Sequence, residues 1–313
     1  MKGYKGATLI ELVITMTLAS IMFMVVSIFI TRPITAYSDV ARRADLVDVA
    51  DLTLRRIARD IQRSVPNSVR IKKDPANNRV AIEILNTVEG MRYRATPPGP
   101  FLSFENSSDD FEVIGEFQFA TDDTTCSDGN CRLVVYNTGA NLGGAVPSDN
   151  PSPGANVYST QAAPNCPGAS TNCLPPPGSV TISPASTSVT ISNTSGTGRL
   201  QLSDPVLFAL PSLTQRIYVS DTPVTYVCDY SSGWQEITRY WDYTINQVQP
   251  IERLLSPLSS ASSAPLAKNI TNCDFTYIPG SSQRNSIVSM KITVEQGGES
   301  VTLMRQMGVF NAL

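Results

Sequence analysis

Histidine is absent from this chain of 313 residues, and charged residues make up only 16% of it. The chain therefore has no imidazole general base, no Ser-His-Asp triad and no histidine ligand for a transition metal. The basic excess typical of nucleic-acid-binding proteins is also missing, because 24 Lys and Arg stand against 27 Asp and Glu. No two of the six cysteines have the Cys-x-x-Cys spacing of zinc and redox motifs. The composition predicts no nucleic-acid partner, no metal and no cofactor.

The six cysteines are even in number and lie in turn-rich or strand-like surroundings, which is typical of a disulfide framework in an oxidising compartment. Two pairs are close enough in sequence to close local loops, with four and six residues between them. The two remaining cysteines then form a third pair. Free thiols in a cytosolic protein are the alternative. The expected bridges are Cys126–Cys131, Cys166–Cys173 and Cys228–Cys273.

Residues 7–30 form an apolar run of 24 residues with a single charge, Glu11. As a helix the run would be about 36 Å long, which is enough to cross a bilayer with some tilt. Lys2 and Lys5 precede it, so the short basic N-terminus is expected to stay cytoplasmic. The cysteines place the bulk of the chain outside. A carboxylate in such a run is costly, so Glu11 needs a partner or must snorkel to the interface.

Pro33 follows the apolar run, and a second helical stretch extends from there to Pro66. Because proline removes a helix hydrogen bond, we expect a rod kinked at Pro33, with its upper half laid on a sheet. Arginines and aspartates interleave over the rest of this stretch, Asp60 among them, which predicts a solvated face and not a lipid- or DNA-binding one. The apolar stripe comprises Leu46, Val49, Ala50, Leu54, Ile57 and Ile61.

From residue 67 to 313 the pattern is that of β-structure, so the sequence predicts an α+β chain with a mainly antiparallel sheet. The Gly297-Gly298 pair supplies the positive φ angles of a tight hairpin turn near the C-terminus. The expected strands lie at 80–85, 115–119, 132–136, 206–210, 216–220, in two runs within 224–245, and on both sides of Gly297-Gly298.

Residues 138–199 differ sharply in composition from the rest of the head. Of these 62 residues, 48 are Gly, Pro, Ser, Thr, Asn or Ala. Such a stretch buries too little apolar surface to offset its ordering entropy. We expect a long exposed excursion, either a spacer or a binding surface, with one strand pair between 180–182 and 189–191.

Few residues of the chain are candidates for a catalytic or metal-binding site. Asp122, Asp123, Asp128 and Asn130 offer oxygen atoms that calcium prefers, but the EF-hand spacing is absent and turn chemistry explains the same residues. Acidic residues at 109 and 110 form no pair flanked by aromatics, as a glycosidase site would. The chain is therefore expected not to be an enzyme.

The string KGATLIELVITMTLASIMF resembles the class III signal of type IV pilins. The resemblance implies a leader at 1–6, a transmembrane helix at 7–32, a stem helix at 33–66 and a periplasmic head at 67–313. It further implies that prepilin peptidase cuts between Gly6 and Ala7, that Ala7 is N-methylated, and that Glu11 assists docking into the filament. Ala7 stands where the family usually has Phe.

Blocks in the second half of the chain are similar to MshO-type minor pilins, the biogenesis proteins of the MSHA (mannose-sensitive haemagglutinin) pilus. They are PVTYVCDY (223–230), RYWDYTI (239–245), NITNCDFTYIPG (269–280) and ESVTLMRQMGVFNAL (299–313), with LRRIARDIQRSVPNSVRI (54–71) at the stem-to-head junction. The resemblance covers most of the chain except 138–199.

This resemblance implies a minor pilin that helps to start the filament or sits at its tip, with the major pilin and other minor pilins as partners. Prepilin peptidase, the inner-membrane assembly platform and inner-membrane lipid are the further partners it implies. The chain would begin in the inner membrane, with its head in the periplasm, and end in the pilus at the cell surface. The alternatives are a tip adhesin for surface carbohydrate, a pseudopilin of type II secretion, and an anchored protein that never enters a filament.

Overall fold

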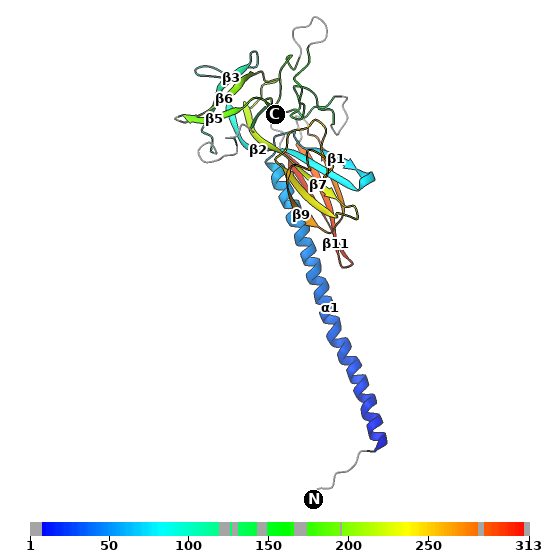
Figure 1. Ribbon diagram of the computed structural model, residues 1–313. Coiled ribbons are helices and arrows are strands. Elements are labelled where there is room, and N and C mark those ends of the chain that lie inside the picture. Colours follow the sequence, from blue (N-terminus) through cyan, green and yellow to red (C-terminus); the bar gives the residue numbers. More distant parts are fainter. Residues whose placement is uncertain are drawn as a thin grey trace.

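The computed structural model describes residues 8–118, 126, 131–142, 149–165, 174–194, 196–280 and 285–309, with the backbone alone at 32–35. It has one long helix, α1 (Leu9–Gln62), and a large antiparallel β head at the C-terminal end of that helix. Figure 1 shows the N-terminal part of α1 projecting alone from the head. The predicted α+β layout is therefore present.

The helix is continuous through Pro33, so the two expected stretches form a single helix. Proline deprives a helix of one hydrogen bond, and the turns on both sides keep the rod intact over its 54 residues. The helix also ends earlier than Pro66, with Arg63 as its C-cap. The chain leaves it there because Val65 N–H donates to Leu85 O at 2.9 Å, so that the exit segment joins the sheet.

Two long strands, β2 (Arg79–Tyr93) and β7 (Arg216–Asp229), form the central ribbon of the head. Their register shifts on both sides of Thr87, where Asp221 and Thr222 lie opposite the single residue Asn86. Such a bulge bends the strand and increases its twist. Shorter segments pair along both outer edges of the ribbon. The outer edge of β2 pairs with β1 (Arg70–Asp74), with residues 63–65 and with β3 (Ser108–Ile114). The outer edge of β7 pairs with β4 (Arg132–Val135) and β8 (Glu236–Trp241).

The remaining strands extend the large sheet and build a second, smaller one. The large sheet runs β5-β6-β3-β2-β7-β8-β9, and the small sheet runs β10-β11-β12. The bounds are β5 (Val189–Thr194), β6 (Thr197–Val206), β9 (Ser262–Lys268), β10 (Ile270–Ile278), β11 (Ser286–Gln296) and β12 (Glu299–Val309).

The head contains two main hydrophobic cores joined by the β2–β7 ribbon. The helix-side core packs the apolar face of α1, including Leu54 and Ile57, against the small sheet and the lower ribbon. The distal core lies around Phe111 and Phe208, among β3, β4, β6 and the upper ribbon. The core around α1 begins at Leu46, and the part of α1 before it projects from the head (Figure 1).

Several predicted strands are present. Those at 80–85, 132–136 and 216–220 fall in β2, β4 and β7, and 224–245 contains the end of β7 and all of β8. The C-terminal hairpin turns at Gly297 and Gly298, whose φ angles are +60° and +84°. The strand expected at 206–210 is wrong, because β6 ends at Val206.

The strand expected at 115–119 is also wrong. Phe117 is buried in the distal core from an irregular segment, and the strand there is β3, just upstream; Phe119 lies outside the described residues. The pair expected between 180–182 and 189–191 is wrong as well, because β5 pairs with β6 while Val180 and Ile182 bridge Phe208 and Val134.

Much of the segment 138–199 is not the exposed excursion that composition predicts. Val157, Tyr158 and Ile182 are buried against Val65 and Leu85, at the helix exit and the ribbon bulge. Side-chain hydrogen bonds to the main chain help to order it; for example, the Tyr158 hydroxyl donates to Ser68 O at 2.8 Å. A few well-placed apolar residues and such polar bonds replace the apolar area that the composition lacks.

Candidate assembly interface

The N-terminal half of α1 is an apolar surface with no cover in the described chain. The side chains of Leu9, Phe23 and Phe29 are 84%, 78% and 80% exposed. Leaving this surface in water would cost on the order of 20 kcal/mol, more than the net stability of a typical domain. By length and composition the helix is apolar enough to cross a membrane.

Three hydroxyl side chains within this run, those of Thr15, Thr17 and Ser20, donate to main-chain oxygens of the helix. The hydroxyl of Ser20 donates to Met16 O at 2.8 Å, and that of Thr15 donates to Leu12 O at 2.9 Å. This pattern suits a helix in lipid, where unpaired polar groups are costly. It leaves Glu11 as the one charge of the run.

Glu11 lies in the first turn of α1 and is exposed. Its main-chain N–H donates to the hydroxyl of Thr8, the N-cap, at 3.4 Å. A carboxylate near a helix N-terminus is favoured by the positive end of the helix dipole. Among the described residues the carboxylate has no ion-pair partner. Gly6 and Ala7, the predicted processing site, lie outside the described residues.

A buried ionic contact fixes the upper half of α1 to the head. Asp60 accepts from the Tyr226 hydroxyl at 2.6 Å and from Arg239 Nε at 3.0 Å, which joins the helix to β7 and β8. Burial, together with the nearby Asp60 charge, raises the pKa of Tyr226, so its hydroxyl stays a donor. The prediction of a solvated face is therefore wrong at Asp60. The contact ties the upper half of α1 to β7 and β8.

A second buried network lies at the base of the ribbon. Arg70 Nε donates to Glu83 at 2.8 Å, and both side chains are almost completely buried. The Tyr243 hydroxyl donates to the other carboxylate oxygen at 3.0 Å, and the Arg70 guanidinium lies 3.6 Å from the Tyr158 ring centre. Burial raises the pKa of the Glu83 carboxyl, and the Arg70 charge opposes that rise. The network joins β1, β2, the loop after β8 and the segment 138–199.

Sequence reasoning missed this network. Its members are scattered over more than 170 positions of the chain, from Arg70 to Gln247, whose main-chain oxygen accepts from the Arg70 guanidinium at 2.7 Å. The one sequence signal for the network is Glu83, a charge within the apolar run VAIEIL. In a strand, successive side chains point to opposite faces of the sheet, so Glu83 lies on the face opposite that of Ile82 and Ile84. In the structure both faces of β2 are buried there.

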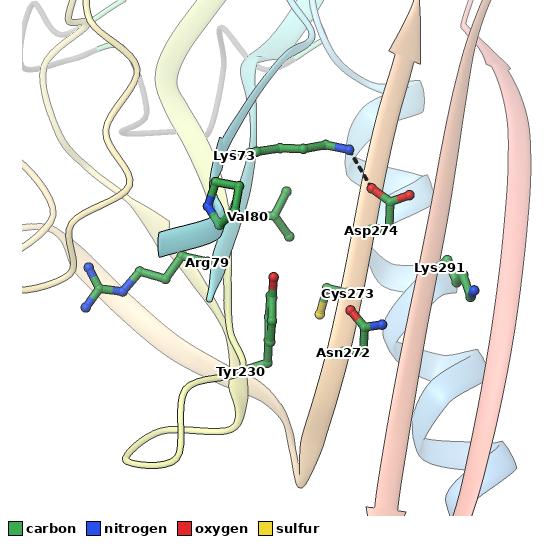
Figure 2. Close-up of a pocket in the computed structure, with 9 residues that line it drawn as sticks. Lys73, Arg79, Val80, Tyr230, Asn272, Cys273, Asp274 and Lys291 are labelled. Carbon is green, nitrogen blue, oxygen red and sulfur yellow. Dashed lines mark hydrogen bonds and ion pairs between the residues drawn. The ribbon is translucent and has the colours of Figure 1, made fainter. Parts of the chain in front are cut away.

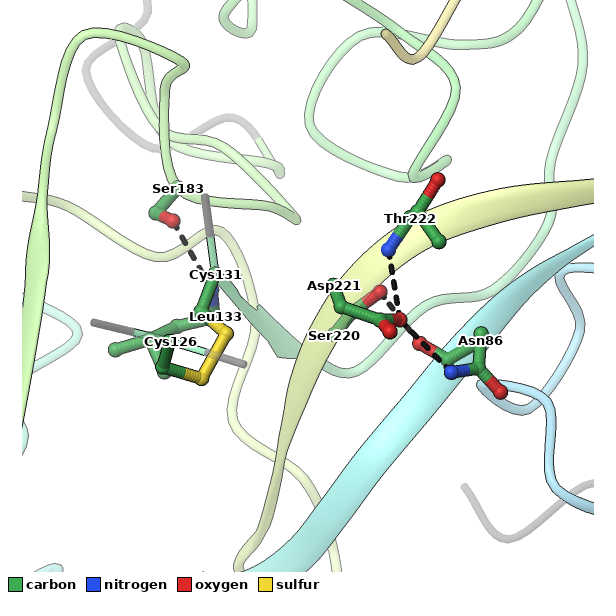
Figure 3. Close-up of a disulfide and its surroundings, with 8 residues drawn as sticks. All are labelled: Asn86, Cys126, Cys131, Leu133, Ser183, Ser220, Asp221 and Thr222. Carbon is green, nitrogen blue, oxygen red and sulfur yellow. Dashed lines mark hydrogen bonds between the residues drawn. A yellow bond between two sulfur atoms is a disulfide. The ribbon is translucent and has the colours of Figure 1, made fainter. Parts of the chain in front are cut away.

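Two of the predicted disulfides are present, and the third lies outside the described residues. Cys126–Cys131 closes a local loop in the distal core beside Leu133 (Figure 3). Cys228–Cys273 joins β7 to β10 and so ties the large sheet to the small one. Cys166 and Cys173 are not among the described residues.

The predicted acidic cluster at 122–130 also lies outside the described residues. Asp110, on β3, forms an ion pair with Arg199 on β6, whose hydrogen bond lowers the pKa of that carboxyl. In the described part of the chain no three Cys, Asp or Glu side chains are grouped to hold a metal ion. Asp110 therefore acts as a structural partner of Arg199.

Figure 2 shows a groove of about 320 Å³ between the β1–β2 hairpin and the small sheet. Lys73 reaches across it to Asp274 at 2.6 Å, and Tyr230 points into it beside Cys273. Arg79, at its rim, is already paired with Asp229 and Glu252. The charged groups are thus largely matched within the chain, and the groove assembles no nucleophile with a base.

Comparisons with protein-family models, with curated proteins and with solved structures found no match to this chain.

Proposed function

We propose that this chain is a minor pilin of a type IV, MSHA-like pilus that helps to initiate the filament or sits in its tip complex. The observation that supports the proposal is a bare apolar stem whose upper half packs on a large β head, with one carboxylate at the start of the stem. Such a stem is stable in lipid or among like helices. Transfer from membrane to filament then exchanges one apolar environment for another.

In this proposal the protein begins in the inner membrane, with its N-terminus cytoplasmic and its disulfide-linked head in the periplasm. Prepilin peptidase processes it, and the assembly platform moves it into a filament of major and minor pilins. The head contributes contacts and performs no catalysis. Mass spectrometry of sheared, purified filaments tests the proposal, because a membrane-anchored protein of another kind would be missing from them.

Processing gives the first prediction. The mature N-terminus should be Ala7, so N-terminal sequencing of the membrane fraction should read ATLIEL. Gly6→Val should block cleavage much more strongly than Gly6→Ala, because the larger side chain hinders close approach of the peptidase to the scissile bond. Retention of MKGYKG in cells with an active peptidase would remove the pilin assignment.

The stem carboxylate gives the second prediction. Glu11→Leu should leave membrane insertion intact or improve it, because a charge in hydrocarbon costs on the order of 2–3 kcal/mol. Incorporation into filaments should fall at least about tenfold, a change of roughly 1.4 kcal/mol, if the carboxylate pairs with the N-terminal amine of a neighbour. Quantitative mass spectrometry of membrane and filament fractions measures both effects.

Thr15→Val is the matched control, since it alters an exposed polar residue of the same stem without removing a charge. It should incorporate like the wild type. Normal incorporation of Glu11→Leu would instead identify Glu11 as a carboxylate that snorkels to the interface.

A further inference from the structure

The free edges of the two sheets differ in how they are protected. Edge strands of soluble proteins usually carry proline, charge or a bulge, because an open edge pairs with other chains. β9 contains Pro265 and is bulged, and β5 has only six residues. β10 is irregular at its start, and Asp274 on it is bound by Lys73 of the neighbouring hairpin.

β12 has neither proline nor a bulge. It pairs with β11 over eleven residues without a register shift and contains no proline. After Glu299 its one charged residue is Arg305, which lies 3.9 Å from Asp51 of α1, so its charge is matched within the chain. Among the described strands, β12 therefore has the long and regular free edge.

The turn geometry shows which main-chain groups face that edge. Gly297 and Gly298 form a two-residue turn closed by Gln296 and Glu299, and the closing pair of such a hairpin is hydrogen-bonded. Since bonded pairs alternate along an antiparallel ladder, the odd-numbered residues of β12 bond to β11. The N–H and C=O groups of the even-numbered residues point away from β11: Ser300, Thr302, Met304, Gln306 and Gly308.

Within the described residues these groups have no main-chain partner outside the hairpin. The side chains beside them are mostly uncharged, and Met304 is 60% exposed. Leu303 and Met307, on the side that faces α1, are only partly buried. An added strand would cover these apolar side chains and pair the free groups.

The position of β12 indicates where such a strand would come from. The hairpin turn contacts α1 low on the stem, where Arg42 Nη1 donates to Gly297 O at 3.3 Å, and β12 then runs beside the helix. Figure 2 shows β12 as the outermost strand of the small sheet, with α1 behind it. The free edge of β12 therefore lies beside the upper part of α1, directly above the exposed apolar part of the helix. A neighbour whose stem lies beside this one would bring its head against β12.

We propose that the free edge of β12 accepts a β-strand from the head of a neighbouring filament subunit, extending the small sheet to four strands. The inference rests on the proposed function, which supplies the neighbour. Main-chain hydrogen bonds provide the affinity in this mode of recognition, and side-chain contacts provide the selectivity. The strand would be extended and mostly uncharged, with apolar residues facing Leu303 and Met307.

Met304→Pro in the full-length chain tests the proposal. Proline there removes one outward N–H and none of the bonds to β11, so the hairpin should persist. Met304→Ala is the matched control, because it removes the same side chain and keeps the N–H. Filament incorporation, measured by quantitative mass spectrometry, should fall about tenfold or more for proline and stay near wild type for alanine. Equal incorporation of the two variants would overturn the proposal.

A photo-crosslinking amino acid at Gln306 provides a measurement that does not depend on how well the proline variant folds. The crosslinked peptide should come from a strand of another subunit, and the same probe at Thr276 on β10 should not give it. Crosslinks confined to this chain or to lipid would refute the docking edge. If Glu11→Leu is lost from filaments while Met304→Pro is retained, the result supports the proposed function and refutes the proposal that β12 accepts a strand.

Discussion

Glu83→Gln should lower the free energy of unfolding of the head by about 3–5 kcal/mol. The amide keeps the shape and part of the hydrogen bonding of Glu83, but it leaves the Arg70 guanidinium buried without a counter-charge. Since typical domains are stable by only 5–15 kcal/mol, much of the variant should be degraded in the cell. Thermal unfolding of the detergent-solubilised chain and its steady-state level measure the effect.

Asp274→Asn is the matched control. Lys73 and Asp274 are as close as Arg70 and Glu83, at 2.6 Å against 2.8 Å, but both are about half exposed. Exposed pairs contribute about 0–1 kcal/mol, so this variant should unfold almost like the wild type. Similar losses in the two variants would show that burial of the Arg70–Glu83 pair is not what makes it important.

Removing the Cys228–Cys273 bridge should cost the head about 4 kcal/mol, by the entropy of closing a loop of this length. The two cysteines are 45 positions apart and connect the two sheets. For a domain of this size the melting temperature should fall by roughly 8–16 °C. The double variant Cys228→Ala/Cys273→Ala measures this without burying a hydroxyl or leaving a free thiol.

Cys126→Ala/Cys131→Ala is the comparison, because that bridge closes a much shorter loop. The same entropy argument gives it about 2 kcal/mol. The shift in melting temperature should therefore be about half as large. Equal shifts, or a larger one for the local bridge, would contradict this ranking.

Local patterns predicted the elements that depend on local chemistry. The apolar run and most of the stripe of α1, the hairpin at Gly297-Gly298 and both described disulfides follow from periodicity, turn residues and spacing. Val49 is the exception in the stripe, because its side chain is exposed. At Pro33 two local effects oppose each other. The proline removes one hydrogen bond, and the helical turns on its two sides continue the helix.

The remaining differences depend on long-range contacts. In the sequence Asp60 resembles the other carboxylates on the surface of the helix. In the structure it differs from them, because the fold brings Tyr226 and Arg239 into contact with it. The composition of segment 138–199 predicts exposure to solvent. In the structure the ring of Tyr158, in this segment, packs against the guanidinium of Arg70. In both cases the partner residue is far away in the sequence, so the periodicity of a local segment cannot predict the contact.

The junction of α1 with the ribbon has a mechanical consequence. The stem enters the head beside the bulge of β2, between the two cores, and the β11–β12 hairpin runs alongside it (Figure 1). Tension along the stem is therefore received first where α1 packs on the small sheet and where Asp60 binds Tyr226 and Arg239. The distal core lies beyond this junction and is connected through the β2–β7 ribbon. A force applied between the stem and the far end of the head should extend the part around the distal core first, while the part cross-linked by Cys228–Cys273 stays folded on the stem.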